Sequence, residues 1–434
     1  MSERIQKSVV TCDLEGRIET YNDGAQKLFG YMAEEVVGKK RVSLFSPGPI
    51  VLEHVNTWLE TARTEGEYRG RTVFLRKDGS PVAADVRITP TWRDGVQIGY
   101  CGVTTPLPDV DPAAVMPKTS PLTKVFSGMV ITRAPFLTAS IIPILIGATW
   151  AVARYSVSPF PWGLLALVLA GGIALHIAAN TFNDYFDWTS GTDPANNNYF
   201  LPYSGGSRSL ELGLISEKGL LRLAWVSLAI AVAAGLILMV VTGPLLLLFG
   251  LFGAFSAYFY TAPPLRLVSR KGLGELIIGL NFGPLMVAGT SYVITGQLHA
   301  IDFLVGVPIG LLTTAILWIN QFPDAEADAS TGKNHLVVVL GKERARWGYL
   351  SLLVVAFGLV VALAVEGIMP WTALLMLGAV PLAVSASRVL YRHYGDRSLV
   401  KANATTIQLH AVAGLLLAAG LFLAAVFGLG AGLS

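Results

Sequence analysis

The sequence predicts an all-α polytopic membrane domain that follows a small soluble α+β domain. Two observations support this fold class: the uneven distribution of charge and the regular recurrence of long apolar segments. The 434 residues are 53% hydrophobic and only 14% charged, with a mean hydropathy of +0.56. Soluble domains average about 25% charged residues, so most of this chain is too apolar for a water-soluble fold.

The charged residues divide the chain into two unlike parts. Residues 1–117 hold 30 charged side chains, about a quarter of their number, whereas residues 118–434 hold 31, about a tenth. The second part therefore has the lipid bilayer as its partner. The net charge of +3 is too small to indicate a nucleic-acid partner.

Short apolar runs alternate with turn residues in the N-terminal part, which predicts an antiparallel sheet with helices on one side. Cys12 and Cys101, the two cysteines, are expected to be reduced thiols. Domains are expected at 1–105 and 122–434, joined by a proline-rich linker over 106–121. The expected strands are 9–12, 17–20, 66–77, 81–90 and 97–104, and the expected helices are 24–37 and 51–65.

Nine apolar stretches in the second part are predicted to be transmembrane helices. Seventeen of the 18 basic residues from Lys118 onward fall on one side of them, and only Arg154 falls on the other. Basic residues favour the cytoplasmic side, so the N-terminal domain is expected in the cytoplasm, at an inner membrane, and the C-terminus outside. The stretches are 129–151, 161–183, 221–242, 244–261, 273–294, 303–322, 347–366, 369–390 and 407–429.

Two clusters of acidic residues lie at the cytoplasmic ends of apolar stretches. If the second predicted helix continues, Asn180, Asp184 and Asp187 share one helical face, with Asn183 beside them and Asp193 shortly after. Acids at the end of a membrane helix are costly and mark functional sites.

The second cluster repeats the pattern, with Asn320, Asp324 and Asp328 spaced by four residues. Carboxylates on one face repel one another unless a cation joins them, and Mg²⁺ binds one or two carboxylates together with substrate phosphates. Two such faces across a cavity predict a Mg²⁺–diphosphate site. Arg208, after a Ser-Gly-Gly-Ser run, and Lys333, after Gly332, would supply positive charge to phosphate oxygens.

These motifs resemble the UbiA superfamily of intramembrane prenyltransferases. The resemblance covers about residues 120–430 and includes Tyr260-Thr-Ala-Pro-Pro-Leu-Arg266. The long gap before Asp193 and the Ser-Gly-Gly-Ser-Arg208 run resemble the 1,4-dihydroxy-2-naphthoate polyprenyltransferase branch of menaquinone synthesis. The resemblance implies nine helices around a central cavity, and transfer of a prenyl group from polyprenyl diphosphate to an aromatic acceptor.

The resemblance also implies roles for individual residues. Mg²⁺ ligands would be Asn183, Asp187, Asp193, Asp324 and Asp328. Asp184 would join Asp187, Asp324 and Asp328 as a catalytic residue, as a ligand or as a base toward the phenol. Residues on the diphosphate side would be Arg208, Lys333, Asn180, Tyr260 and Arg266.

Two alternatives remain at this point. The same fold could prenylate another acceptor, such as 4-hydroxybenzoate, another phenol, haem or glycerol phosphate. The chain could also be a membrane receptor without catalysis, although no output motif accompanies its N-terminal domain.

The N-terminal domain resembles the PAS sensor fold. The resemblance rests on Asp13-Leu-Glu-Gly16, Asn22-Asp-Gly24-Ala25 and Lys77-Asp-Gly-Ser80. It implies a regulatory ligand, which the sequence does not identify, or pairing of two such domains in a dimer.

Overall fold

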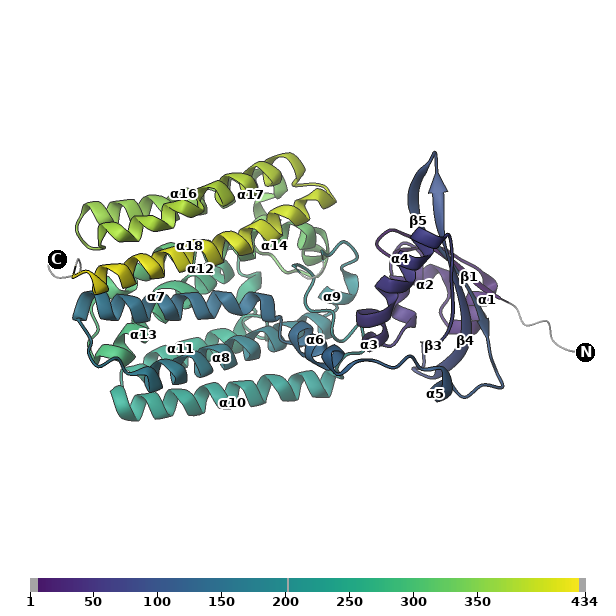
Figure 1. Ribbon diagram of the computed structural model, residues 1–434, viewed down its shortest axis with the longest axis horizontal. Helices are drawn as coiled ribbons and strands as arrows, with labels where there is room; N and C mark the ends of the chain where they lie inside the picture. The colour runs from purple at the N-terminus through teal and green to yellow at the C-terminus, as the bar shows by residue number, and fades with distance from the viewer. Residues whose placement is uncertain (1–6, 201–202, 429–434) are drawn as a thin grey trace, which may run out of the picture. The chain divides into compact units, whose positions relative to one another are not determined.

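The computed structural model describes residues 7–200 and 203–428, and the chain divides into two compact units (Figure 1). The first unit holds Met1–Ile131 and Arg208–Ser216, and the second holds Thr132–Ser207 and Glu217–Ser434. This division differs from the expected boundary at residue 122. Helix α6 (Pro121–Ile131) and a segment distant in sequence both join the N-terminal unit.

The first unit contains a five-stranded antiparallel sheet in the order β2-β1-β5-β4-β3, which confirms the predicted α+β domain. The strands are β1 (Ser8–Asp13), β2 (Ile18–Tyr21), β3 (Tyr68–Leu75), β4 (Pro81–Arg93) and β5 (Val96–Pro106). Helical segments are α1 (Asp23–Phe29), α2 (Ala33–Val36), η1 (Val42–Phe45), α3 (Gly48–Ile50), η2 (Val51–Val55), α4 (Asn56–Glu65) and α5 (Pro112–Val115).

The two cysteines lie on neighbouring strands but on opposite faces of the sheet. Cys12 pairs with Tyr100 in the register and Cys101 pairs with Thr11, so the two side chains alternate across the pleat. Burial raises the pKa of the Cys12 thiol to about 12, whereas Cys101 is partly exposed. Both are free thiols, as expected, and Cys101 is the more accessible.

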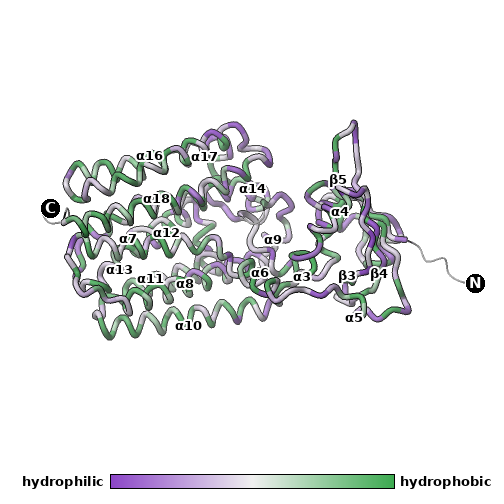
Figure 2. The backbone as a smooth tube through the Cα atoms, in the orientation of Figure 1, coloured by the Kyte–Doolittle hydropathy of each residue, from purple (hydrophilic) through white to green (hydrophobic). Residues whose placement is uncertain are grey.

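The second unit is helical, and eight helices within the described residues are long and apolar enough to cross a membrane (Figure 2). Ala134–Tyr155 comprises η3 (Ala134–Leu137) and α7 (Thr138–Tyr155). Four others are single helices: α8 (Trp162–Thr189), α10 (Glu217–Thr242), α14 (Ala300–Ser330) and α16 (Lys342–Val365). The remaining spans combine consecutive segments: α12 (Leu273–Leu280), η5 (Asn281–Leu285) and α13 (Met286–Thr295); η6 (Trp371–Ala379) and α17 (Val380–His393); and η7 (Arg397–Leu399) and α18 (Val400–Val426). Short helices are α9 (Thr192–Ala195), η4 (Leu267–Ser269) and α15 (Leu336–Leu340).

The helix count differs from the nine predicted. The stretch expected at 244–261 forms α11 (Leu246–Phe259), whose 14 residues extend about 21 Å, less than the ~30 Å hydrocarbon core. The helix expected from 129 begins instead at Ala134, because Arg133 adopts a left-handed backbone with φ of 54° and interrupts it. The last expected helix ends at 429, which lies outside the described residues.

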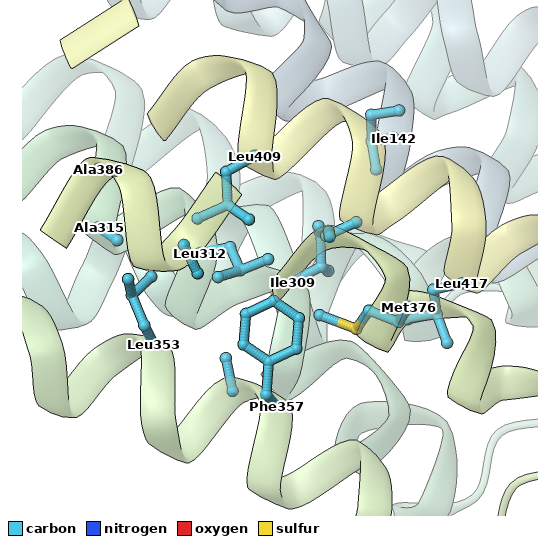
Figure 3. Packing of buried hydrophobic residues seen from close by; sticks show 14 of the residues in the cluster. Ile142, Ile309, Leu312, Ala315, Leu353, Phe357, Met376, Ala386, Leu409 and Leu417 are labelled. Carbon is cyan, nitrogen blue, oxygen red and sulfur yellow. The ribbon is translucent and has the colours of Figure 1, made fainter. Parts of the chain in front are cut away.

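Buried hydrophobic side chains from α7, α14, α16, η6 and α18 form the main core of the second unit (Figure 3). Glycines allow the backbone of α14 to come into contact with the backbone of α12 and η5. A Cβ atom at Gly283 would lie 2.5 Å from the Gly310 Cα, and one at Gly306 would lie 2.6 Å from the Gly283 carbonyl oxygen. Small residues in this spacing allow membrane helices to pack closely. This packing fixes the position of α14, which carries the second aspartate cluster.

We expect Gly306→Ala to lower the thermal unfolding midpoint of the detergent-solubilised protein. The added methyl group meets backbone rather than a movable side chain, and overpacking of this kind costs about 1–3 kcal/mol. Gly358→Ala on α16 is the matched control, since a Cβ there meets nothing within 4 Å. An equal midpoint for the Gly306 variant and the control would contradict the close packing.

Candidate active site

The first aspartate cluster lies on the last two turns of α8. As predicted, the helix continues through these residues, and it ends at Thr189 before Gly191, whose φ is 82°. Asn180, Asn183 and Asp187 line one cavity. Asp193, in the short helix that follows, lines the same cavity.

The second cluster lies on the last turns of α14, and Asn320, Asp324 and Asp328 line the same cavity. The structure therefore brings together two clusters that are about 140 residues apart in the sequence. Both clusters are at the C-terminal ends of their helices, where the helix dipole places partial negative charge. Carboxylates there increase that charge, so the site requires positive charge and hydrogen-bond donors.

Lys333 supplies part of that charge between the two clusters. Its Nζ lies 2.8 Å from Asp187 Oδ2 and 3.8 Å from Asp328 Oδ1. Burial alone would lower the pKa of Lys333, but the two carboxylates outweigh burial and raise the pKa above its ordinary value. Lys333 is therefore a fixed cation that joins the two helix ends.

His335 holds the other oxygen of Asp328. Its side chain is fully buried, with Nε2 3.0 Å from Asp328 Oδ2, and its Nδ1 accepts a hydrogen bond from the Val338 backbone N–H at the start of α15. Because Nδ1 is an acceptor, the neutral ring carries its proton on Nε2 and donates it to the carboxylate. His335 thereby fixes the orientation of Asp328.

The glycine-rich run contributes backbone N–H groups to carboxylates of both clusters. Gly205 N donates to Asp324 Oδ2 at 2.9 Å, and Ser207 N lies 3.3 Å from both oxygens of Asp184. Gly206 has a φ of 75°, and a Cβ there would lie 2.8 Å from Asp193 Oδ2. Only glycine fits this close approach.

Asp184 lies behind the cavity lining and does not reach its surface. Besides the Ser207 N–H it meets Arg133, whose Nε is 3.7 Å from Asp184 Oδ1. Arg133 itself lines the cavity, and its Nη1 lies 3.4 Å from Asn183 Oδ1. Asp184 thus orients the loop and Arg133, and its geometry does not support the expected role as a base toward substrate.

The residues expected on the diphosphate side are only partly together. Lys333, Asn180 and Tyr260 line the cavity, and Arg208 and Arg266 do not. Arg208 forms an ion pair with Glu211 at 3.0 Å and belongs with it to the N-terminal unit. Tyr260 has a buried hydroxyl without a partner among the described residues.

The chemistry of the donors fits Mg²⁺ bound together with a phosphate ligand. Among the described residues, no three His, Cys, Asp or Glu side chains converge closely enough to hold a metal ion without further ligands. Mg²⁺ keeps several waters and takes one or two carboxylates plus substrate phosphates. A set of three or more protein ligands around the ion is therefore not required. Asp187, Asp324 and Asp328 are hard oxygen donors on facing helices, and Asn183 adds an amide oxygen.

Apolar side chains line much of the rest of the cavity, and within the described part of the chain its charged lining residues are Arg133, Asp187, Asp193, Asp324, Asp328 and Lys333. His176 also lines the cavity, and its Nδ1 is 2.7 Å from Ser140 Oγ. The part of the cavity with apolar lining suits a long hydrocarbon tail. The apolar lining includes Phe136, Leu175, Phe282, Met286, Ile316 and Leu317.

Three residues that contact the clusters were missed at the level of sequence: Arg133, Asn196 and His335. Asn196 Nδ2 donates to Asp324 Oδ1 at 2.7 Å. The position of His335 before the apolar run at 336–340 was an available signal, since such a position caps a helix, but histidine is not a favoured capping residue.

Both parts of the chain are similar to known proteins. The UbiA prenyltransferase family profile matches residues 140–404, and a PAS domain profile matches residues 6–104. The 1,4-dihydroxy-2-naphthoate octaprenyltransferase of Bacillus subtilis is 29% identical over 294 residues, which are 68% of this chain and 91% of the relative. The 2-carboxy-1,4-naphthoquinone phytyltransferase of Synechocystis is 30% identical over 314 residues, 70% of this chain and 95% of the relative. A solved UbiA homolog from Archaeoglobus fulgidus bound to GPP and Mg²⁺ is 15% identical, with 67% and 99% of the two chains covered and a TM-score of 0.47.

We expect His335→Asn to weaken divalent-metal binding by about 10–100-fold, the usual effect of losing a partner that orients a ligand. Asn keeps an acceptor for the Val338 N–H but is too short to reach Asp328. Binding of Mn²⁺ in the presence of inorganic diphosphate, followed by electron paramagnetic resonance, measures the effect. His335→Gln is the matched control, because its longer amide reaches Asp328 and should restore binding. Equal binding by wild type and His335→Asn would contradict the role.

Proposed function

Because the chain belongs to the UbiA prenyltransferase family and its relatives act on naphthoates, we propose that it transfers a polyprenyl group to 1,4-dihydroxy-2-naphthoate in menaquinone biosynthesis. It is a multi-pass membrane protein and an aromatic prenyltransferase with an N-terminal PAS domain. The proposal rests mainly on one observation: the C-terminal ends of α8 and α14, which carry the aspartates, line one cavity together with apolar side chains.

In the proposed reaction the allylic C–O bond of the diphosphate breaks and a C–C bond to the aromatic ring forms. Diphosphate leaves with the electron pair of the broken bond, and a ring proton is lost to a base. Asp187, Asp324 and Asp328 would hold Mg²⁺ together with Asn183, and the metal would supply positive charge to the leaving diphosphate. Lys333 adds a fixed positive charge beside the same oxygens, and the apolar half of the cavity excludes water from the allylic carbon.

The proposed topology places the aspartate clusters and the PAS domain in the cytoplasm and the C-terminus outside. The clusters end α8 and α14, and the connecting segments at those ends carry nearly all the basic residues of the membrane unit. The positive-inside rule assigns that side to the cytoplasm.

We expect Asp187→Asn and Asp324→Asn each to reduce prenylation by more than about 100-fold, since loss of an outer partner alone costs about 10–100-fold. Membranes containing the protein are incubated with polyprenyl diphosphate, 1,4-dihydroxy-2-naphthoate and Mg²⁺, and the prenylated product is quantified. Glu326→Gln is the matched control, because Glu326 lies on the same helix end but outside the cavity, with a 75% exposed side chain.

Activity retained in the Asp187→Asn, Asp324→Asn double variant would overturn the mechanism. Product formed only from another phenol would leave the mechanism but change the acceptor.

We also propose that the PAS domain regulates the enzyme through the segment Arg208–Ser216. This segment belongs to the N-terminal unit, where a Cβ at Gly48 would collide with the Leu212 carbonyl oxygen and lie 2.6 Å from Leu214. It follows directly after Ser207, whose N–H meets Asp184. A displacement of the segment would therefore be passed along the backbone to the loop that holds Asp184 and Asp324.

We expect Gly48→Ala to raise the KM for the prenyl diphosphate, because the new methyl group displaces Leu212 and Leu214. Gly102→Ala, elsewhere in the same domain, is the control, since its Cβ would meet only the Val10 carbonyl oxygen at 3.8 Å. Steady-state kinetics of the two variants make the comparison. Identical KM values for the Gly48→Ala and Gly102→Ala variants would exclude regulation through this segment.

A further inference from the structure

Helix α6 of the N-terminal unit carries an exposed apolar face. Leu122, Val125, Phe126 and Met129 are 64%, 59%, 56% and 43% exposed. Their spacing of three, four and seven residues places them on one side of the helix. Lys124 is the only charged residue among the eleven and lies on the opposite side. A continuous apolar strip of this kind marks a surface that something covers.

The flank of α6 that carries Thr123 packs on the PAS domain, while Lys124 remains exposed. Thr123 is only 4% exposed, and its hydroxyl donates a hydrogen bond to the Glu53 carboxylate. The Ser120 N–H donates to the same carboxylate at 2.9 Å, and the Lys118 carbonyl oxygen lies 3.1 Å from His54 Nε2. These contacts fix the rotation of α6 on the domain, so its apolar face is presented in one direction.

Chain continuity identifies what covers that face. α6 ends at Ile131, and the first membrane-spanning segment begins at Ala134, three residues later. Three residues reach at most about 10 Å, so the end of α6 is held at the membrane boundary. The left-handed backbone at Arg133 interrupts the chain between α6 and the first membrane-spanning segment, so α6 is a separate helix and not part of that segment.

We propose that α6 lies in the membrane surface, with Leu122, Val125, Phe126 and Met129 among the lipid acyl chains, and anchors the PAS domain to the bilayer. Amphipathic helices with such a face lie in the interface with that face about 5–10 Å deep. Lys118 and Lys124 add positive charge with no acidic residue in the helix, which suits an anionic lipid surface. The occupant is the bilayer, since the helix is tethered to it and the other side is already covered by protein.

The test is site-directed spin labelling of the full chain in nanodiscs made from equal amounts of phosphatidylcholine and phosphatidylglycerol. The background is Cys101→Ser, because Cys12 is buried. Single variants Val125→Cys, Phe126→Cys and Met129→Cys report on the apolar face, and Lys124→Cys on the opposite side is the matched control. Collision rates with oxygen, which partitions into lipid, and with a water-soluble nickel complex are measured.

We expect the three apolar positions to be reached by oxygen and protected from nickel, and Lys124→Cys to show the reverse. Access of nickel to the apolar positions would show that the face is in water and would overturn the proposal. Protection from both reagents would also overturn it, because a protein surface, such as a second copy of the chain, would then cover the face. Because three positions are labelled separately, failure of one variant to fold leaves the others to decide, and the result does not depend on the catalytic activity proposed above.

Discussion

The constraint on which the structure depends is the gathering of carboxylates at the negative ends of two helices. Asp187 on α8 and Asp328 on α14 are both buried, where charge repulsion is weakly screened. The fold stabilises these carboxylates with one cation, Lys333, which contacts both helix ends, and with hydrogen-bond donors. Those donors are the Gly205 and Ser207 N–H groups, Asn196 and His335. The loops that follow both helices are thus shaped by the electrostatic requirements of the site.

The same arrangement explains why the carboxylates remain available for catalysis. These donors hold the aspartate oxygens by hydrogen bonds, so the carboxylates are oriented before substrate binds. Lys333 differs from the other donors because it is a full cation that contacts two carboxylates, those of Asp187 and Asp328. The site is therefore preorganised for a ligand that brings its own negative charge together with divalent cations.

The sequence predicted features that depend on periodicity. The spacing of four residues predicted that Asn320, Asp324 and Asp328 share one face, and all three line the cavity; on α8 the lining residues are Asn180, Asn183 and Asp187, without the expected Asp184. The alternation of apolar and turn residues predicted the five strands of the PAS domain, and all five are present. The prediction that Arg208 faces the diphosphate differs from the structure, where Arg208 forms an ion pair with Glu211. The sequence shows that a positive charge lies near the motif, but it does not show which carboxylate that charge contacts. The break at Arg133 was missed because a left-handed arginine has no sequence signature comparable to glycine or proline. His335 was missed because its role depends on a tertiary contact with Asp328.

The N-terminal unit is assembled from two separate stretches of chain, and this affects how the protein can be dissected. Removing residues 1–117 would delete the PAS domain but leave Leu212 and Leu214, which belong to the same N-terminal unit, without the surface around Gly48 that they pack against. A truncated enzyme would then combine the loss of the PAS domain with newly exposed apolar side chains in this segment. Its altered kinetics would not measure regulation alone, and point substitutions at the Gly48 contact separate the two effects more cleanly than any truncation.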